Sequence, residues 1–319
     1  MNIVCNGSIA YDYLMTFPGY FKEHIIPEHL DKISLSFLVD SMIRQRGGIA
    51  PNIAYTLALL GEKPHLMGTV GEDFEDYRKW LEEKGIDCQY VKVIEGDYTA
   101  SFFANTDLAN NQICSFYTGA MAHAANYSMD VIKEKPDLVI ISPNDPIGMD
   151  NYVRECQAKN IPYLYDPSQQ TVRLSGEQLC RGVQGAYSLF VNEYEYELVQ
   201  KHSCLKPEEI KECVKILVVT LGEKGSVIYS EGKEYNVSVV EPEKIIDPTG
   251  VGDSYRGGFV KGLSMKADLK TCGQMGAVAA AYCLEQRGTQ NHHYSKKEFV
   301  ERYRKSFNDQ GVLDVLIKE

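Results

Sequence analysis

From about residue 130 onward, short apolar runs alternate with longer amphipathic segments. Four runs are apolar throughout, as strands are when both faces of a sheet are buried. They lie at residues 138–141, 162–166, 187–191 and 216–220. The stretch at 151–159 and the one that begins at Glu193 have helical spacing. Because buried strands separated by helices form a parallel sheet covered on both sides, the pattern predicts a Rossmann-like, three-layer α/β/α domain.

Polar residues stand at or just past the ends of the predicted strands. Asp166, Asn192 and Thr220 follow three of the apolar runs, and Asp247 follows the apolar pair at 245–246, which we interpret as a further short strand. The carboxyl ends of parallel strands meet at one edge of a sheet, where such folds bind ligands. The sequence therefore predicts a nucleotide or substrate cleft along this edge.

Two segments outside this pattern are rich in β signals. Residues 9–40 are rich in aromatic side chains, and two strands are expected at 98–103 and 112–117, on either side of a polar loop. We expect the segments 9–40 and 97–121 to form a small β-sheet lid, although they can also pack on the sheet edge without moving. The large α/β domain then comprises residues 1–8, 41–96 and 122–319.

The composition limits the partners of the protein. The 319 residues carry a formal net charge of −11, and 44% of them are hydrophobic, as in ordinary globular proteins. Nucleic acids and anionic membranes attract basic proteins, so neither is expected as a partner. No apolar run has the length of a membrane span, and the chain opens with a strand-like run rather than a leader. We therefore expect a cytoplasmic protein.

The stretch at residues 245–259 carries the strongest chemical signal. Asp247 is followed by a turn with Gly250 and Gly252, then by Asp253 and an apolar-patterned segment. The first N–H groups of a helix have no partner within the helix and favour an anion, so this turn suits a phosphate. Asp253 can take the proton of a hydroxyl that attacks the phosphoryl group. Alone, the stretch fits an ordinary strand–turn–helix joint about as well.

Two segments near the N-terminus suit a polyol. Gly47 and Gly48 permit close backbone approach ahead of a predicted helix, and Asn52 can donate and accept hydrogen bonds. Asp12, just after the first strand, can accept two hydroxyl groups of a sugar. Taken alone, the first segment is more typical of a plain helix start and Asp12 of a surface turn.

Two further segments suit a nucleotide. Asn192 and Glu195 lie three residues apart at a predicted helix start and suit Mg²⁺, partly through water, or simple helix capping. Thr220, Gly222 and Gly225 form a turn after a strand, where the backbone can approach a phosphate or ribose. A hairpin joint explains the same turn.

Taken together, the ordered set resembles the ribokinase-like family, also called the PfkB carbohydrate kinases. The matching positions are Gly47, Gly48 and Asn52; Asn192 and Glu195; Thr220, Gly222 and Gly225; and Asp247, Gly250, Gly252 and Asp253. The resemblance implies an α/β domain with a β lid, ATP with Mg²⁺ as phosphate donor and a CH₂OH group as acceptor. It implies Asp253 as the base, and an anion hole of N–H groups from Gly250, Val251 and Gly252.

The resemblance also places a monovalent cation such as K⁺ at Asp247 and Thr249. Three positions depart from the family pattern. Pro248 stands where the family usually has Thr and removes an N–H donor from the turn. Val251 stands where it usually has Ala and adds bulk beside the anion hole, and Pro51 replaces a small residue. These departures affect the cation site and the turn geometry rather than the base.

The residues of the predicted lid indicate which acceptor to expect. Residues 8–19 and 111–121 look most like the bacterial and archaeal adenosine kinases of the family. The lid aromatics Phe102, Phe103, Phe116 and Tyr117 can sandwich a purine ring, pack the lid on the body or pair two lids in a homodimer. In a separate role, Arg256 can reach a transferring phosphate or pair with Asp247 or another acid.

We expect ATP-dependent phosphorylation of the 5′-hydroxyl of adenosine. A sugar kinase acting on ribose, fructose or a phosphosugar is the alternative within the family. The predicted lid offers few basic residues, Lys22 and Lys32, for a phosphosugar. A nucleoside- or sugar-binding regulator without catalysis is the alternative from another class. The sequence leaves the oligomeric state and the phosphate donor open.

Overall fold

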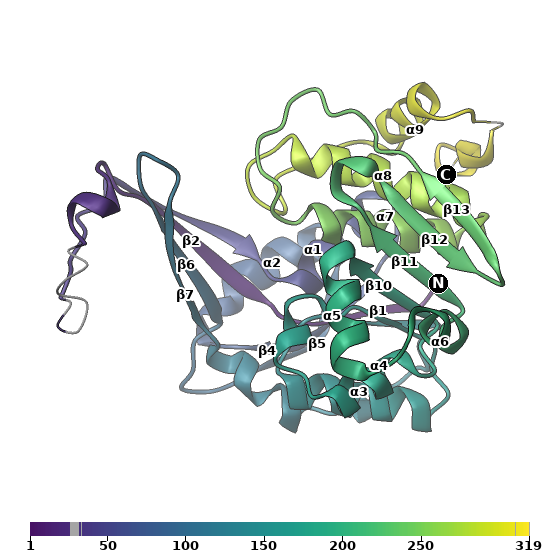
Figure 1. Cartoon of the computed structure of the whole chain (residues 1–319), viewed down its shortest axis with the longest axis horizontal. Coiled ribbons are helices and arrows are strands. Elements are labelled where there is room, and N and C mark those ends of the chain that lie inside the picture. Colours follow the sequence, from purple (N-terminus) through teal and green to yellow (C-terminus); the bar gives the residue numbers. More distant parts are fainter. Residues whose placement is uncertain (26–31, 33, 310, 319) are drawn as a thin grey trace.

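The computed structural model describes residues 1–25, 32, 34–309 and 311–318. Their strands form two sheets, a large one within the body and a small one that projects from it (Figure 1). Residues 26–31 and 33 of the predicted lid lie outside the described residues. Within the described part, no helix combines the length and the apolar character needed to cross a membrane.

The large sheet contains nine strands of the described chain. These are β1 (Ile3–Asn6), β4 (His65–Val70), β5 (Asp87–Val93), β8 (Leu138–Ile141), β9 (Tyr163–Tyr165), β10 (Ser188–Asn192), β11 (Ile216–Thr220), β12 (Ser226–Ser230) and β13 (Lys233–Val237). Their order is β13-β12-β11-β10-β9-β8-β1-β4-β5. The pairs from β5 to β11 are parallel, and β12 and β13 add an antiparallel edge. All four apolar runs predicted as strands are confirmed.

Helices cover both faces of this sheet. Alternating residues of each strand point to opposite faces, so Ile3 and Cys5 enter one apolar core and Val4 the other. The first core is completed by α1 (Ile49–Leu59), α2 (Glu75–Glu83), α7 (Val251–Ser264), α8 (Leu269–Leu284) and α9 (Lys296–Ser306). The second is completed by α3 (Pro146–Ala158), α4 (Gly176–Val183), α5 (Glu193–Ser203) and α6 (Pro207–Cys213). The predicted three-layer α/β/α architecture is confirmed.

One helix begins earlier than its pattern predicts. The apolar spacing indicates a helix at 151–159, whereas α3 starts at Pro146. The side chain of Asp145 accepts hydrogen bonds from the N–H groups of Ile147 and Gly148, and Pro146 needs no N–H partner at the first helical position. Capping, rather than the apolar stripe, therefore sets this helix start.

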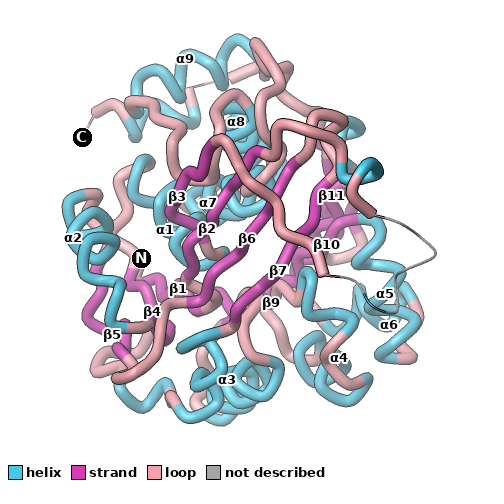
Figure 2. The backbone as a smooth tube through the Cα atoms, turned by 90° about the vertical axis from the view of Figure 1, so that its left-hand side faces the viewer, coloured by secondary structure: helices cyan, strands magenta, loops and turns pink. Residues whose placement is uncertain are grey.

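The small sheet has the order β3-β2-β6-β7. Its strands are β2 (Ala10–Thr16), β3 (Ser41–Gly47), β6 (Ala100–Thr106) and β7 (Gln112–Tyr117). β2 and β6 are parallel, and the two outer pairs are antiparallel. Figure 2 shows the four strands side by side across one face of the body. A separate β sheet is confirmed as the second part of the fold.

β3 belongs to this small sheet and not to the body, so the predicted boundary after Asp40 is misplaced. β3 pairs with β2 along its whole length, from Ser41 opposite Thr16 to Gly47 opposite Ala10. It is an edge strand with its first residues exposed, and therefore lacks the apolar signature of a buried strand.

The predicted strand at 245–246 is wrong. Ile245 is 71% exposed and Ile246 is 42% exposed, so this apolar pair does not enter the sheet. The N–H groups of Ile246 and Asp247 donate instead to the carbonyl of Leu284, at the end of α8. Asp247 thus reaches the site from a loop fastened to a helix end.

The centre of the large sheet is a topological switch point. From β1 the chain order runs outward in both directions, through β4 on one side and β8 on the other. The residues after these strands approach closely: the N–H of Ser8 donates to the carbonyl of Pro143 at 2.7 Å. A Cβ added to Gly7 would lie 2.0 Å from the Oγ of Ser142. Ligands of open α/β sheets bind beside such a point.

The packing of α7 on α8 generates a test. A Cβ at Gly258 would lie 2.6 Å from the carbonyl oxygen of Met275. Alanine has a higher helix propensity than glycine, so any loss of stability in Gly258→Ala comes from packing. We expect the free energy of unfolding in urea to fall by about 2 kcal/mol. Glu83→Ala, at an exposed position of α2, should stay within about 0.5 kcal/mol of the unaltered protein. Stabilisation by Gly258→Ala would contradict the close packing.

Candidate active site

A cleft of about 780 Å³ lies between the two sheets, at the carboxyl ends of the parallel strands. Ser8 and Pro143 line it from the switch point, and Asn192 and Thr220 line it from two further strand ends. Asp166 follows a fifth strand, β9, and pairs with Arg256, which lines the cleft. The predicted cleft at this edge of the sheet is therefore present.

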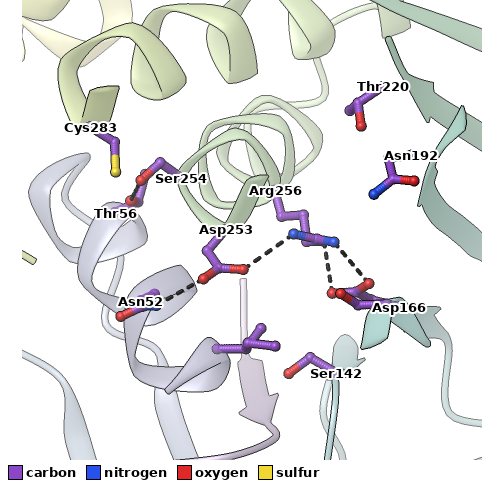
Figure 3. A network of polar contacts seen from close by, with 12 residues as sticks. Asn52, Thr56, Ser142, Asp166, Asn192, Thr220, Asp253, Ser254, Arg256 and Cys283 are labelled. Atoms are coloured by element: carbon purple, nitrogen blue, oxygen red, sulfur yellow. Dashed lines mark hydrogen bonds and ion pairs between the residues drawn. The ribbon is translucent and has the colours of Figure 1, made fainter. Parts of the chain in front are cut away.

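Asp253 stands in the first turn of α7, within the cleft. Its two carboxylate oxygens have different partners: Asn52 Nδ2 donates to Oδ2 at 2.8 Å, and Arg256 Nη1 to Oδ1 at 3.2 Å (Figure 3). Burial raises the pKa of Asp253 to about 6, with Arg256 and Asn52 opposing the rise. A carboxylate with this pKa can accept a proton near neutral pH.

The glycine turn ahead of Asp253 is held tightly. Gly250 has a φ of 77°, and a Cβ there would lie 2.8 Å from the side chain of Thr289. Gly250 and Gly252 line the cleft. Val251 is not among the lining residues, and its N–H faces the carbonyl of Pro248 at 3.4 Å. The geometry therefore suits an anion site in which Gly250 and Gly252 donate N–H groups. It does not support the predicted role of Val251 as a third N–H donor.

A buried chain of polar groups orients Asn52. Gln290 Nε2 donates to Asn52 Oδ1 and to the hydroxyl of Tyr77, both at 2.6 Å. The hydroxyl of Tyr77 donates in turn to the carbonyl of Gly47. With Oδ1 engaged by Gln290, the amide of Asn52 presents Nδ2 to Asp253. The sequence identified Asn52 and Gly47, but no local pattern marked Gln290 or Tyr77.

Asp12 faces the same cleft from β2. Burial raises its pKa to about 6, and the charges of Asp247 and Asp253 add to the rise. A Cβ at Gly47 would lie 2.5 Å from Asp12 Oδ2, so glycine leaves room for this carboxylate. Gly48, with a φ of 92°, makes the turn into α1. The predicted polyol residues thus come together.

Asp247 is held by backbone N–H groups. Thr249 donates to its Oδ1 and Gly288 to its Oδ2, both at 2.9 Å. Burial opposes ionisation, but these hydrogen bonds outweigh it and lower the pKa of Asp247 below its ordinary value. The predicted cation-binding pair, Asp247 and Thr249, is therefore first of all a turn-stabilising pair.

Asn192 and Glu195 form a reciprocal capping box at the start of α5. Asn192 Oδ1 accepts from the N–H of Glu195, and Glu195 Oε2 accepts from the N–H of Asn192, both at 2.8 Å. Ser168 donates to the remaining oxygen of Glu195 at 3.2 Å. Both residues also line the cleft, so the capping box stands in its wall.

The turn after β11 is only partly in the cleft. Thr220 lines it, whereas Gly222 and Gly225 are not among the lining residues. A Cβ at Gly225 would lie 2.1 Å from the carbonyl of Val237. These glycines shape the hairpin between β11 and β12, as the alternative interpretation of this turn held.

Strand alternation divides the lid aromatics into two pairs. Phe102 and Phe116 are direct partners on β6 and β7 and line the cleft. Phe103 stacks on Tyr13 at 4.8 Å between ring centres, and the hydroxyl of Tyr117 donates to Asp97 at 2.8 Å. Tyr117 is therefore wrongly predicted as a substrate contact, since it follows Phe116 and points to the other face.

Several glutamines in the cleft were missed. Gln45, Gln112, Gln169 and Gln170 line it, together with Ser168. Ser168, Gln169 and Gln170 follow Asp166 after Pro167, at a strand end where the sequence pattern marks the aspartate alone. Among the described residues, no group of three or more His, Cys, Asp or Glu side chains is arranged to hold a metal ion.

Solved structures share this fold. The structure of a ribokinase from Thermotoga maritima has a TM-score of 0.78 at 22% identity, covering 96% of this chain and 99% of that one. The nucleoside kinase of Burkholderia thailandensis in complex with inosine has a TM-score of 0.86 at 35% identity, covering 97% of this chain and 99% of that one. The fold is therefore ribokinase-like.

The sequence comparisons give the family. The model of the pfkB family carbohydrate kinases matches residues 9–296, so the chain belongs to the PfkB family. The nucleoside kinase of Methanocaldococcus jannaschii is 31% identical over 305 residues, which are 95% of this chain and 97% of the relative. That of Methanothermobacter thermautotrophicus is 31% identical over 310 residues, 95% of each. The predicted family is confirmed.

The raised pKa of Asp12 gives a stability prediction. Between the unfolded value near 4 and the folded value of about 6, the native state holds more protons, so stability falls as pH rises through this range. Asp12→Asn removes the free-energy cost of burying an ionised carboxylate. The variant should be more stable than the unaltered protein by about 1–2 kcal/mol at pH 8, with little difference at pH 4. Urea unfolding at both pH values measures this.

The matched control is Asp40→Asn, at an exposed position beside the lid. It should leave the free energy of unfolding at pH 8 within about 0.5 kcal/mol. The burial argument is contradicted if the stability gained by Asp12→Asn over the unaltered protein is smaller at pH 8 than at pH 4.

Proposed function

We propose that this protein transfers the γ-phosphoryl group of ATP to the 5′-hydroxyl of a nucleoside, with adenosine as the expected acceptor. The observation that carries the proposal is the meeting of three features in one cleft. These are the base Asp253 beside the glycine turn, the polyol pair Asp12 and Asn52, and the aromatic pair Phe102 and Phe116. The two nucleoside kinases that span 95% of the chain support the same reaction class.

The chemistry follows from these positions. Asp253 takes the proton of the attacking hydroxyl as its oxygen bonds to the γ-phosphorus and the bond from phosphorus to the leaving ADP oxygen breaks. The N–H groups of Gly250 and Gly252, at the start of α7, stabilise the negative charge on the phosphoryl oxygens. Asp12 and Asn52 hold the hydroxyl groups of the ribose, which brings the 5′-hydroxyl toward Asp253.

The base of the nucleoside is expected under the lid. Phe102 and Phe116 offer flat apolar faces for a purine. Gln112, on the same lid, has an amide that can donate or accept, and so suits the 6-amino group of adenosine and the 6-oxo group of inosine alike. The Burkholderia structure with inosine supports a purine nucleoside.

A phosphosugar fits the cleft less well. Because β3 belongs to the small sheet, the lid also contains Arg44 and Arg46, but neither residue lines the cleft. Arg44 lies over the ring of Tyr11 at 3.7 Å and Arg46 over Trp80 at 4.6 Å, while Gln45 between them faces the cleft. The strand thus presents an amide, and not its charges, to a ligand.

We also propose the partners that the reaction needs. Mg²⁺ would neutralise the phosphates of ATP; Asn192 and Glu195 line the cleft and keep free lone pairs, which fits a hydrated ion. K⁺ at Asp247 and Thr249 and a homodimer through the exposed strand β7 are part of the same proposal. The cell compartment is expected to be the cytoplasm, where ATP is available.

The test is turnover with defined acceptors. Purified protein with Mg²⁺ and ATP is offered adenosine, inosine, cytidine, ribose or fructose 6-phosphate, and ADP and the phosphorylated product are quantified by chromatography. We expect AMP from adenosine, and a loss of about 10³-fold in kcat for Asp253→Asn, because the variant has no base. Glu83→Gln, on the exposed face of α2, serves as the matched control and should retain full activity.

The outcomes separate the alternatives. Phosphorylation of inosine or cytidine in preference to adenosine keeps a nucleoside kinase and overturns adenosine as the acceptor. Turnover with a sugar alone supports a sugar kinase and contradicts the part given to Phe102 and Phe116. Binding of nucleoside without any turnover supports the regulator.

A further inference from the structure

Arg256 divides its guanidinium between two carboxylates. Its Nε and Nη2 lie 2.8 Å from Oδ2 and Oδ1 of Asp166, as a side-on fork. The remaining nitrogen, Nη1, donates to Asp253 at 3.2 Å. Figure 3 shows Arg256 between the two acids, with Asn52 on the far side of Asp253. Each nitrogen of the guanidinium thus has one partner.

Asp166 is a fixed anchor. It is 0% exposed, directly after β9, and its N–H donates to the carbonyl of Ile141 at 2.9 Å. A buried carboxylate is costly without a partner, and Arg256 supplies one charge-assisted hydrogen bond, from Nη2 to Oδ1, and a close ion pair between Nε and Oδ2. The Arg256 side chain is itself only 11% exposed, although it lines the cleft. Its orientation is therefore set by the body of the protein and not by solvent.

We propose that Asp166 is a positioning residue: it fixes Arg256 so that a single N–H holds the carboxylate of Asp253, leaving the guanidinium unavailable to the transferring phosphate. The contacts with Asp166 occupy Nε and Nη2 of Arg256, so only Nη1 is left to donate to Asp253, at its Oδ1. Asn52 completes the hold from the opposite side at 2.8 Å. The role of Asp253 as the base rests on the proposed function.

The arrangement has an electrostatic consequence for Asp253. Its pKa is raised by burial, lowered by Arg256 and Asn52, and raised by Glu195. The charged or titratable groups that face it come from its own helix and from four further places in the fold. They are Arg256 on its own helix, Asp166 after β9, Glu195 on α5, Asp12 on β2 and Cys283 on α8. Removing the positive charge raises the pKa of Asp253, and removing the charge of Asp166 lowers it.

The experiment follows the ¹³Cγ chemical shift of Asp253 against pH in the ligand-free protein, assigned by its absence in Asp253→Asn. Arg256→Met should raise the titration midpoint by about 1 pH unit or more, and Asp166→Asn should lower it because all of the guanidinium becomes available to Asp253. Arg256→Lys keeps the charge without the fork, and its midpoint should lie between those of Arg256→Met and the unaltered protein.

The matched control is Arg181→Met. Arg181 also pairs with an aspartate, Asp150, but this pair joins α4 to α3 away from the cleft, so the midpoint of Asp253 should not move. If Arg256→Met does not fold, the shifts of Arg256→Lys and Asp166→Asn, in opposite directions, still decide. Equal midpoints in all variants, or shifts of Arg256→Met and Asp166→Asn in the same direction, overturn the proposal.

A kinetic readout separates this proposal from the proposed function. The acid limb of kcat/KM for the nucleoside should move in the direction of the ¹³C midpoint in each variant. Shifts in the ¹³C titration with no turnover on any acceptor keep the positioning role and overturn the kinase. Turnover without any shift overturns the positioning role alone.

Discussion

The site depends on keeping several carboxylates ionised in a place that excludes much of the solvent. Burial penalises the charged form of an acid, and the cost falls only when hydrogen bonds or an opposite charge replace the lost water. The fold gives different partners to these acids. Two backbone N–H groups donate to Asp247, and Arg256 pairs with both Asp253 and Asp166. Burial still raises the pKa of Asp12 and of Asp253 to about 6. The helix starts and turns around the cleft are thus part of its electrostatics.

This dependence explains why the sequence predicted the main groups of the site but not their supports. Asp253, Asn52 and Asp12 each follow a glycine within five residues, near a strand or helix start, and those local patterns can be recognised in one stretch of chain. The bond from Gln290 to Asn52 joins residues 238 positions apart, and that from Arg256 to Asp166 spans 90. Nothing in either local sequence records such a partner, because the partner is brought by the packing of helices on the sheet.

The fold was predictable where both faces of a strand are buried, since such strands are apolar throughout. Edge strands and loops give weaker signals. β3 carries polar and charged side chains because its first residues are exposed, so its sequence does not predict a strand of the small sheet. The pair Ile245 and Ile246 is apolar and predicts a strand, but both residues are exposed and lie outside the sheet. For Tyr117 the strand was right and the face was wrong, since a step of one residue reverses the direction of a side chain.

The charges of the cleft also bear on the phosphate donor. A polyphosphate that enters meets Asp12, Asp247 and Asp253, while the guanidinium of Arg256 is already shared between two acids. The positive ends that remain are the N–H groups of the turn at Gly250 and Gly252, which suit one phosphoryl group and not a whole triphosphate. The repulsion between these carboxylates and a polyphosphate is reduced when the nucleotide carries a bound cation. On electrostatic grounds, a cleft rich in carboxylates therefore favours a metal-complexed donor for the proposed reaction, and Glu195, which lines this cleft, would be one of the residues to meet the water shell of that cation.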